Sequence, residues 1–235
     1  MNMDFNDERI KEAVRHTETL RLPKQSLATF GTTNIYYYLL TRPVYSELVK
    51  DADETVIREG RVIAERPRVV TPYYLSHLQG FSAEAQKYFD MLTQQYGGGA
   101  PGLLYSYRNE PKELNIVSDS LTSVVDRLNA DIDQRGDPMT TIIKGEDELW
   151  DVSLMKFIYD MTRGSVGDNL RQLGSRGMLK VDKGGLPAAA RKGIEELFQK
   201  VSLGKAEPGD LKDELDRWGV FPEYEDRFFA LFGDK

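Results

Sequence analysis

Four carboxylates crowd the segment KGEDELWD, residues 144–151. Asp147 and Asp151 are spaced i, i+4, so a helix would place them on one face, where Glu146 could supply a further oxygen. Carboxylate oxygens are ligands that divalent cations such as Mg²⁺ and Ca²⁺ prefer. Acidic residues at a helix start also interact favourably with the helix dipole. The segment therefore predicts either a divalent-metal site at Glu146, Asp147 and Asp151 or a charged helix N-terminus.

Arginines gather in ETVIREGRVIAERPRVV, residues 54–70, within reach of several tyrosines. Glu59-Gly60 stands between two apolar pairs, which predicts a β-hairpin. Guanidinium groups beside aromatic rings bind phosphates and stack on bases. Glutamates alternate with the arginines, so cross-strand ion pairs explain the same pattern. The hairpin is a candidate nucleotide or RNA site with four arginines: Arg58, Arg61, Arg66 and Arg68.

A second hairpin is predicted in LLYSYRNEPKELNIV, residues 103–117. Two alternating apolar runs would form the strands, and Asn109-Glu110-Pro111-Lys112 has the composition of the turn between them. Side chains at the end of a strand are well placed to contact ligands. The end of the first strand and the turn are therefore a candidate small-molecule site, formed by Tyr107, Arg108, Asn109 and Glu110.

Aromatic residues crowd the C-terminal end of the chain between residues 218 and 232. Packing of terminal helices onto the body explains such a cluster. The alternative is that part of it is exposed and docks a protein partner or a second copy of the chain. The candidate docking residues are Trp218, Phe221, Phe228 and Phe229.

Composition excludes several chemistries. The chain has no cysteine, so disulfides, thiolate catalysis and iron–sulfur clusters are ruled out. Its two histidines do not have the spacing of a metalloprotease motif. The net charge of −7 argues against a sequence-independent nucleic-acid coat, although a local basic patch stays open.

The first residues, MNMDFNDERI, are acidic where a secretory signal would be basic and apolar. The longest apolar runs fall far short of the roughly 20 residues that span a bilayer. We therefore expect a cytoplasmic protein that does not associate with membranes.

Periodicity predicts strands at residues 33–41 and 139–144 and an amphipathic helix at 118–136. No strand is predicted after Gly145. A helix over 146–164 is apolar on more than one side, so it should be well buried, and four shorter helices follow it: 165–174, 187–204, 210–219 and 222–233.

The sequence thus predicts an α+β fold: a mixed or antiparallel sheet with packed helices, followed by an all-helical C-terminal region. The expected domains are a body at 1–163, with a candidate junction at 97–102, and a helical region at 164–235. We expect a non-enzymatic binding or assembly protein that uses its aromatic C-terminus. Two alternatives stay open. One is a metal-dependent hydrolase of a phosphate-containing substrate, and the other is nucleotide or RNA binding. Only the hydrolase would need a cofactor, a divalent metal ion.

Overall fold

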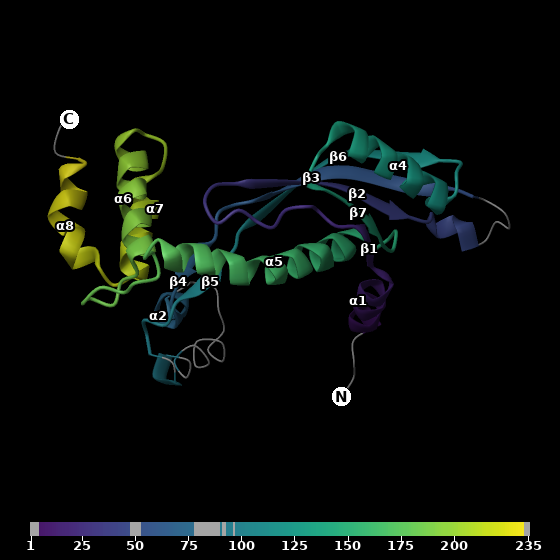
Figure 1. Cartoon of the computed structure of the whole chain (residues 1–235). Coiled ribbons are helices and arrows are strands. Elements are labelled where there is room, and N and C mark those ends of the chain that lie inside the picture. Colours follow the sequence, from purple (N-terminus) through teal and green to yellow (C-terminus); the bar gives the residue numbers. More distant parts are fainter. Residues whose placement is uncertain (1–4, 48–52, 78–89, 91–92, 96, 233–235) are drawn as a thin grey trace. The chain divides into compact units, whose positions relative to one another are not determined.

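The computed structural model describes residues 5–47, 53–77, 90, 93–95 and 97–232 (Figure 1). They belong to two compact units, each built from two stretches of chain. Unit 1 comprises residues 1–66 and 105–169, and unit 2 comprises residues 67–104 and 170–235. A mixed sheet with packed helices, followed by helices at the C-terminal end, confirms the predicted α+β class.

Unit 1 is built on a five-stranded sheet with the strand order β1-β7-β2-β3-β6. The central strand β2 pairs parallel with β7, and the other neighbours are antiparallel. Helix α1 (Phe5–His16) precedes the sheet, and a short 3₁₀ helix, η1 (Val44–Glu47), follows β2. The strands are β1 (Glu18–Arg21), β2 (Thr33–Thr41), β3 (Thr55–Ala64), β6 (Tyr107–Val117) and β7 (Thr140–Lys144).

The strand β2 confirms the prediction of an inner strand at residues 33–41. Its sequence, TNIYYYLLT, is rich in the aromatic and β-branched residues that strands favour. Ile35, Tyr37 and Leu39 are buried on one face of the sheet, and Leu40 is buried on the other. Burial of each such side chain stabilises the fold by about 1.5–3 kcal/mol.

Helices cover both faces of this sheet, α4 (Leu121–Arg135) on one and α5 (Trp150–Ser175) on the other (Figure 1). In α4, Val124, Leu128 and Ile132 recur at i, i+4 and i+8 and pack on the sheet. The Ser120 hydroxyl accepts the Ser123 N–H at the helix start. Gly136 ends the helix in the left-handed region, at φ 66°, as the sequence indicates.

The predicted hairpin around Glu59-Gly60 is wrong, because residues 55–64 form one unbroken strand, β3. Gly60 is opposite Tyr37 of β2, and a Cβ added there would lie 2.3 Å from the Tyr37 hydroxyl. The glycine therefore makes room for a buried ring on a neighbouring strand. A glycine between two apolar pairs is also typical of a turn, and the sequence near Gly60 does not distinguish the two cases.

The second predicted hairpin is also wrong. Residues 109–112, expected to form the turn, lie inside the eleven-residue strand β6. β6 is an edge strand, where a proline such as Pro111 costs no ladder hydrogen bond if its nitrogen faces outward. Its pairing with β3 shifts register between Glu59 and Gly60, so that Lys112 is the extra residue of a bulge.

A third correction concerns α5. The sequence predicts one helix over 146–164 and another over 165–174, but the structure has a single helix of 26 residues. Leu154, Phe157 and Ile158 are buried against the sheet. The second apolar side of the helix is exposed, since Met155 and Tyr159 are 62% and 63% exposed.

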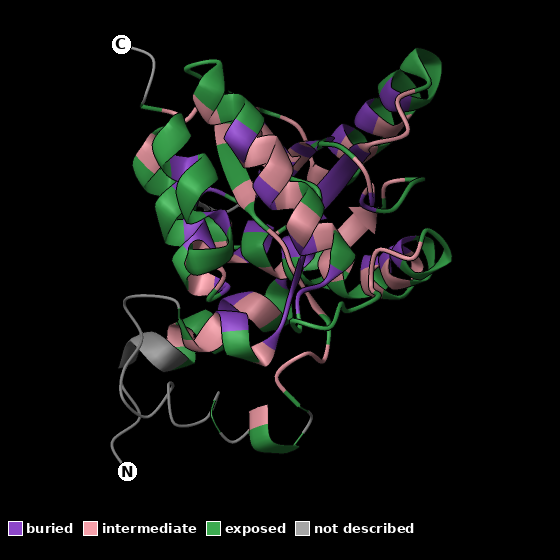
Figure 2. Ribbon diagram, turned by 90° about the vertical axis from the view of Figure 1, so that its left-hand side faces the viewer, coloured by how far each residue is buried: buried purple, intermediate pink, exposed green. Residues whose placement is uncertain are grey.

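Unit 2 has its own core of helices and a two-stranded sheet. The strands β4 (Arg68–Val70) and β5 (Gly102–Leu104) pair antiparallel. Buried side chains come from β4, from the helix that follows it and from the three C-terminal helices, and Figure 2 shows buried and exposed residues alternating along helices. These helices are α2 (Pro72–Ser76), α6 (Ala188–Ser202), α7 (Pro208–Arg217) and α8 (Phe221–Ala230).

The two compact units do not follow the predicted domain ranges, because residues 67–104 group with the C-terminal helices. Compactness alone does not test independent folding, so the ranges 1–163 and 164–235 stay a prediction. Among the described helices, none has the length and apolar character needed to cross a bilayer.

Candidate functional site

The C-terminal aromatic residues divide into an inner and an outer group. Trp218, Tyr224 and Phe228 are buried in the core of unit 2, each less than 10% exposed. The Trp218 indole N–H donates to Glu214 at 3.1 Å, and its ring lies 4.7 Å from that of Tyr74. Trp218 and Phe228, two of the predicted docking residues, therefore lie inside the core.

The outer group forms what we call the outer aromatic face: Phe221, Phe229 and Phe232. Phe229 and Phe232 are 56% and 52% exposed, and Phe221 is partly buried. The Phe229 ring meets the Phe221 ring edge to face, at 6.4 Å between centroids. The Phe232 ring packs instead against the buried Phe228 ring, at 5.5 Å. Phe232 lies outside the predicted candidates, although its i+3 spacing from Phe229 could have indicated it.

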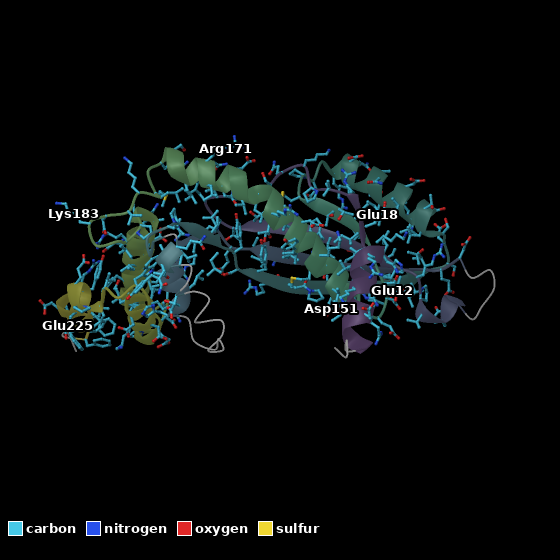
Figure 3. All side chains as sticks on the ribbon, turned by 90° about the horizontal axis from the view of Figure 1, so that it is seen from below. Glu12, Glu18, Asp151, Arg171, Lys183 and Glu225 are labelled. Atoms are coloured by element: carbon cyan, nitrogen blue, oxygen red, sulfur yellow. The ribbon has the colours of Figure 1, made fainter. Side chains whose placement is uncertain are left out.

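The surroundings of the outer aromatic face are acidic. Between residues 207 and 227 the sequence has eight carboxylates and three basic side chains. Each of the three basic residues is engaged by a carboxylate: Lys212 with Asp216, Arg217 with Glu214 and Arg227 with Glu195. Glu225, labelled in Figure 3, is an exposed carboxylate on α8 itself. Glu214 is buried, and the Lys212 ammonium lies 5.2 Å from the centroid of the Phe221 ring. The excess of negative charge near the exposed rings therefore comes from the other carboxylates of residues 207–226.

The carboxylates of the KGEDELWD segment are bound to different partners. Glu146 pairs with His16 of α1 at 2.8 Å. The Asp147 carboxylate accepts from the Thr41 hydroxyl at 2.6 Å and pairs with Arg58 at 2.8 Å. Asp151, labelled in Figure 3, lies in the first turn of α5. Within the described part of the chain, no group of three or more His, Cys, Asp and Glu residues could hold a metal ion.

The ion pair between Arg58 and Asp147 is mostly buried, with side chains 15% and 19% exposed. The Arg58 guanidinium also donates to the Thr41 hydroxyl at 3.0 Å and lies over the Trp150 ring of α5 at 5.7 Å. Its charge is thus balanced locally, and it joins β3 to the start of α5. This arrangement is the one expected of a structural ion pair.

The predicted arginine group is divided by the fold. Arg58 and Arg61 are three residues apart on one strand, so their side chains lie on opposite faces of the sheet. Arg66 follows the end of β3, and Arg68 lies in unit 2. There Arg68 pairs with Glu214, a carboxylate that also accepts from the Tyr74 hydroxyl at 3.2 Å.

On the α4 side of the sheet, Arg61 does lie among tyrosines. Arg61 interacts with Tyr36, and the Lys112 ammonium lies 5.3 Å from the centroid of the Tyr36 ring. Arg135 donates to the Tyr38 hydroxyl at 3.1 Å, beside an open hollow of about 310 Å³. Sequence reasoning missed Lys112 and Arg135, because only the strand pairing and the end of α4 bring them to these tyrosines.

The four residues of the predicted small-molecule site alternate along the start of β6. Tyr107 and Asn109 lie on the α5 side, where the Tyr107 hydroxyl bonds Thr162 and Asn109 accepts from the Tyr37 hydroxyl at 3.1 Å. Arg108 and Glu110 lie on the opposite side. Arg61 holds the pKa of the Glu110 carboxyl below its ordinary value.

Comparisons of the chain with protein-family models, curated proteins and solved structures find no match.

Proposed function

We propose that this chain is a non-enzymatic, cytoplasmic binding protein that docks a protein partner through the outer aromatic face. The observation that supports this most directly is the pair Phe229 and Phe232. Both rings are more than half exposed, although Phe228, next to Phe229 on α8, is buried. Single exposed apolar residues are ordinary, whereas three neighbouring aromatic residues are the composition of an interface core.

Charge favours a basic partner over a second copy of the same face. Two copies meeting here would bring two acidic surfaces together, and like charges across an interface oppose binding. A helix with an apolar stripe flanked by lysine or arginine would cover the rings and pair with the carboxylates. We therefore propose a basic amphipathic helix as the partner element.

A designed helical peptide of leucine and lysine is a suitable probe for this proposal. In isothermal titration calorimetry, the double variant Phe229→Ala/Phe232→Ala should bind the peptide about tenfold more weakly than the wild-type chain, or worse. Added salt should weaken the wild-type interaction, because it screens the carboxylates. Leu203→Ala is the matched control, since Leu203 is 66% exposed in the same unit.

A peptide of leucine and glutamate with the same pattern serves as the second control and should not bind. Equal binding of both peptides, or unchanged binding by the double variant, would contradict the proposal. Thermal unfolding of each variant must accompany the titration, because Phe229 also contacts the buried Phe228 ring at 5.6 Å.

The two alternatives stay predictions. For a metal-dependent hydrolase, two of the three candidate carboxylates already have protein partners: Glu146 pairs with His16, and Asp147 pairs with Arg58. For nucleotide or RNA binding, Arg61 and the nearby tyrosines share a sheet face, but Glu110 already engages Arg61.

A further inference from the structure

The strand β6 ends the sheet of unit 1 and, within the described part of the chain, pairs with β3 alone. The outer side of an edge strand presents N–H and C=O groups that can pair with another strand. Proteins normally block such edges with proline, charged side chains or bulges. β6 is eleven residues long, and its two halves differ in these blocking features.

The blocking features are concentrated in the first half of β6. It contains Pro111, the bulge at Lys112 and the charged Arg108, which is 71% exposed. The second half, residues 113–117, pairs with β3 without a bulge. It presents Leu114 and Ile116, which are 55% and 53% exposed. This half of the edge has the apolar character of a pairing site.

The register of the sheet shows which way these two side chains point. Leu114 is opposite Arg58, whose guanidinium lies over the Trp150 ring of α5. Residues opposite each other in an antiparallel pair share a face, and residues two apart along a strand do too. Leu114 and Ile116 therefore lie on the α5 side of the sheet.

Helix α5 adds apolar surface along the same edge. Thr162 of α5 contacts the Tyr107 hydroxyl at the start of β6. Met155 and Tyr159 precede Thr162 by seven and three residues, so all three lie along one stripe of the helix. Met155 and Tyr159 are the exposed apolar residues of this stripe. Met155 and Tyr159 thus add exposed apolar side chains to the side of α5 that carries Thr162.

We propose that residues 113–117 pair antiparallel with the same residues of a second copy of this chain, around a two-fold axis at Asn115. This register places Leu114 opposite the partner's Ile116, and Ile116 opposite the partner's Leu114. On the other face it places Glu113 opposite the partner's Val117. All four exposed apolar side chains then meet without opposing like charges.

Two other registers satisfy the side chains less well. A two-fold axis at Glu113 would oppose two carboxylates and bring Pro111 into the ladder. An axis at Ile116 would place Leu114 opposite the partner's Ser118, outside the strand. The symmetry of the pattern Leu-Asn-Ile about Asn115 is the reason for choosing a second copy as the occupant.

Cysteine cross-linking tests this register directly, because the chain has no cysteine of its own. Opposed residues of an antiparallel pair have Cα atoms about 4.5–5.5 Å apart, within the range of a disulfide. Under mild oxidation, Asn115→Cys should give a disulfide-linked dimer. Arg108→Cys, in the blocked half of the same strand, should stay monomeric.

Sedimentation velocity on the full chain provides the second readout. Ile116→Lys should lower the dimer fraction at a given concentration at least several-fold, whereas Leu22→Lys, at a residue 68% exposed elsewhere in unit 1, should not. Phe229→Ala/Phe232→Ala should dimerise like the wild type, which separates this proposal from the docking proposal. Equal cross-linking at both cysteine positions, or a dimer unaffected by Ile116→Lys, would overturn it, as would a wild-type chain that neither sediments as a dimer nor cross-links through Asn115→Cys.

Discussion

Single residues in this protein take their roles from neighbours that are distant in sequence. Gly60 illustrates this, because the atoms that require a glycine belong to Tyr37 on the adjacent strand. The Tyr37 ring is 1% exposed and its hydroxyl donates to Asn109, so the ring has little room to move. Burial raises the pKa of this tyrosine above its ordinary value. Gly60, in the middle of β3, is therefore required because the Tyr37 ring packs against it.

We expect Gly60→Ala to lower the free energy of unfolding by about 1–3 kcal/mol, the usual cost of overpacking a core. Gly164→Ala is the control, since Gly164 lies in α5 with no atom within 4 Å of the added Cβ. The control should raise the free energy of unfolding by about 0.5–1 kcal/mol. Urea denaturation measures both, and equal effects of the two changes would refute the packing argument.

At the scale of elements, the helices of unit 2 are joined by charged side chains at their ends. Helix α6 begins at Ala188, and its N-cap residue Pro187 provides no side-chain hydrogen bond. The loop before the helix is ordered by Asp182 instead. This carboxylate accepts the N–H groups of Leu186 and Gly184 and bonds Arg191 at 2.6 Å. Arg191 also pairs with Glu223 at 2.6 Å, which connects the loop, α6 and α8.

We expect these contacts to make the stability of unit 2 sensitive to acid. The Leu186 N–H, together with Arg191, holds the pKa of Asp182 below its ordinary value of 3.8. A carboxylate with a lowered pKa stabilises the fold above pH 3.8, and this contribution is lost as the pH falls below that value. Asp182→Asn should therefore lower stability at neutral pH and reduce its acid dependence.

Urea denaturation of the wild type and of Asp182→Asn between pH 2 and pH 7 measures this dependence. The two curves of unfolding free energy should converge at the acid end. Glu225→Gln, at an exposed carboxylate on α8, is the control. A constant difference between wild type and Asp182→Asn across the whole range would show that the charge of Asp182 is not responsible.

At the scale of the whole molecule, each unit depends on segments separated by long stretches of sequence. The core of unit 2 combines Val70 and Tyr74 with helices that begin more than a hundred residues later. Glu214 of α7 binds Arg68 and the Tyr74 hydroxyl, so polar contacts also connect α7 to β4 and α2. The C-terminal helices thus complete a core to which residues 67–104 contribute.

We expect a fragment of residues 164–235 to lack a native-like fold, because it loses Val70, Tyr74 and the Arg68 partner of the mostly buried Glu214. Removing one partner of such a carboxylate is costly. Near-ultraviolet circular dichroism reports the packing of Trp218, the single tryptophan of the fragment. A fragment with a native-like spectrum and cooperative unfolding would instead support the domain limits predicted from the sequence.

The sequence alone determined the features that depend on neighbours along the chain. The inner strand at 33–41, the capped helix ending at Gly136 and the α+β class follow from composition, periodicity and local hydrogen bonding. The lack of cysteine excluded thiol chemistry in the same direct way.

Only the tertiary structure decided whether Gly60 and Pro111 form turns, and which aromatic residues are exposed. A glycine or proline is compatible with a turn, but also with a ring packed above it or with a sheet edge. Phe228 and Phe229 are adjacent in sequence, yet one is buried and the other exposed. The choice depends on packing against distant segments, and local sequence does not encode that packing.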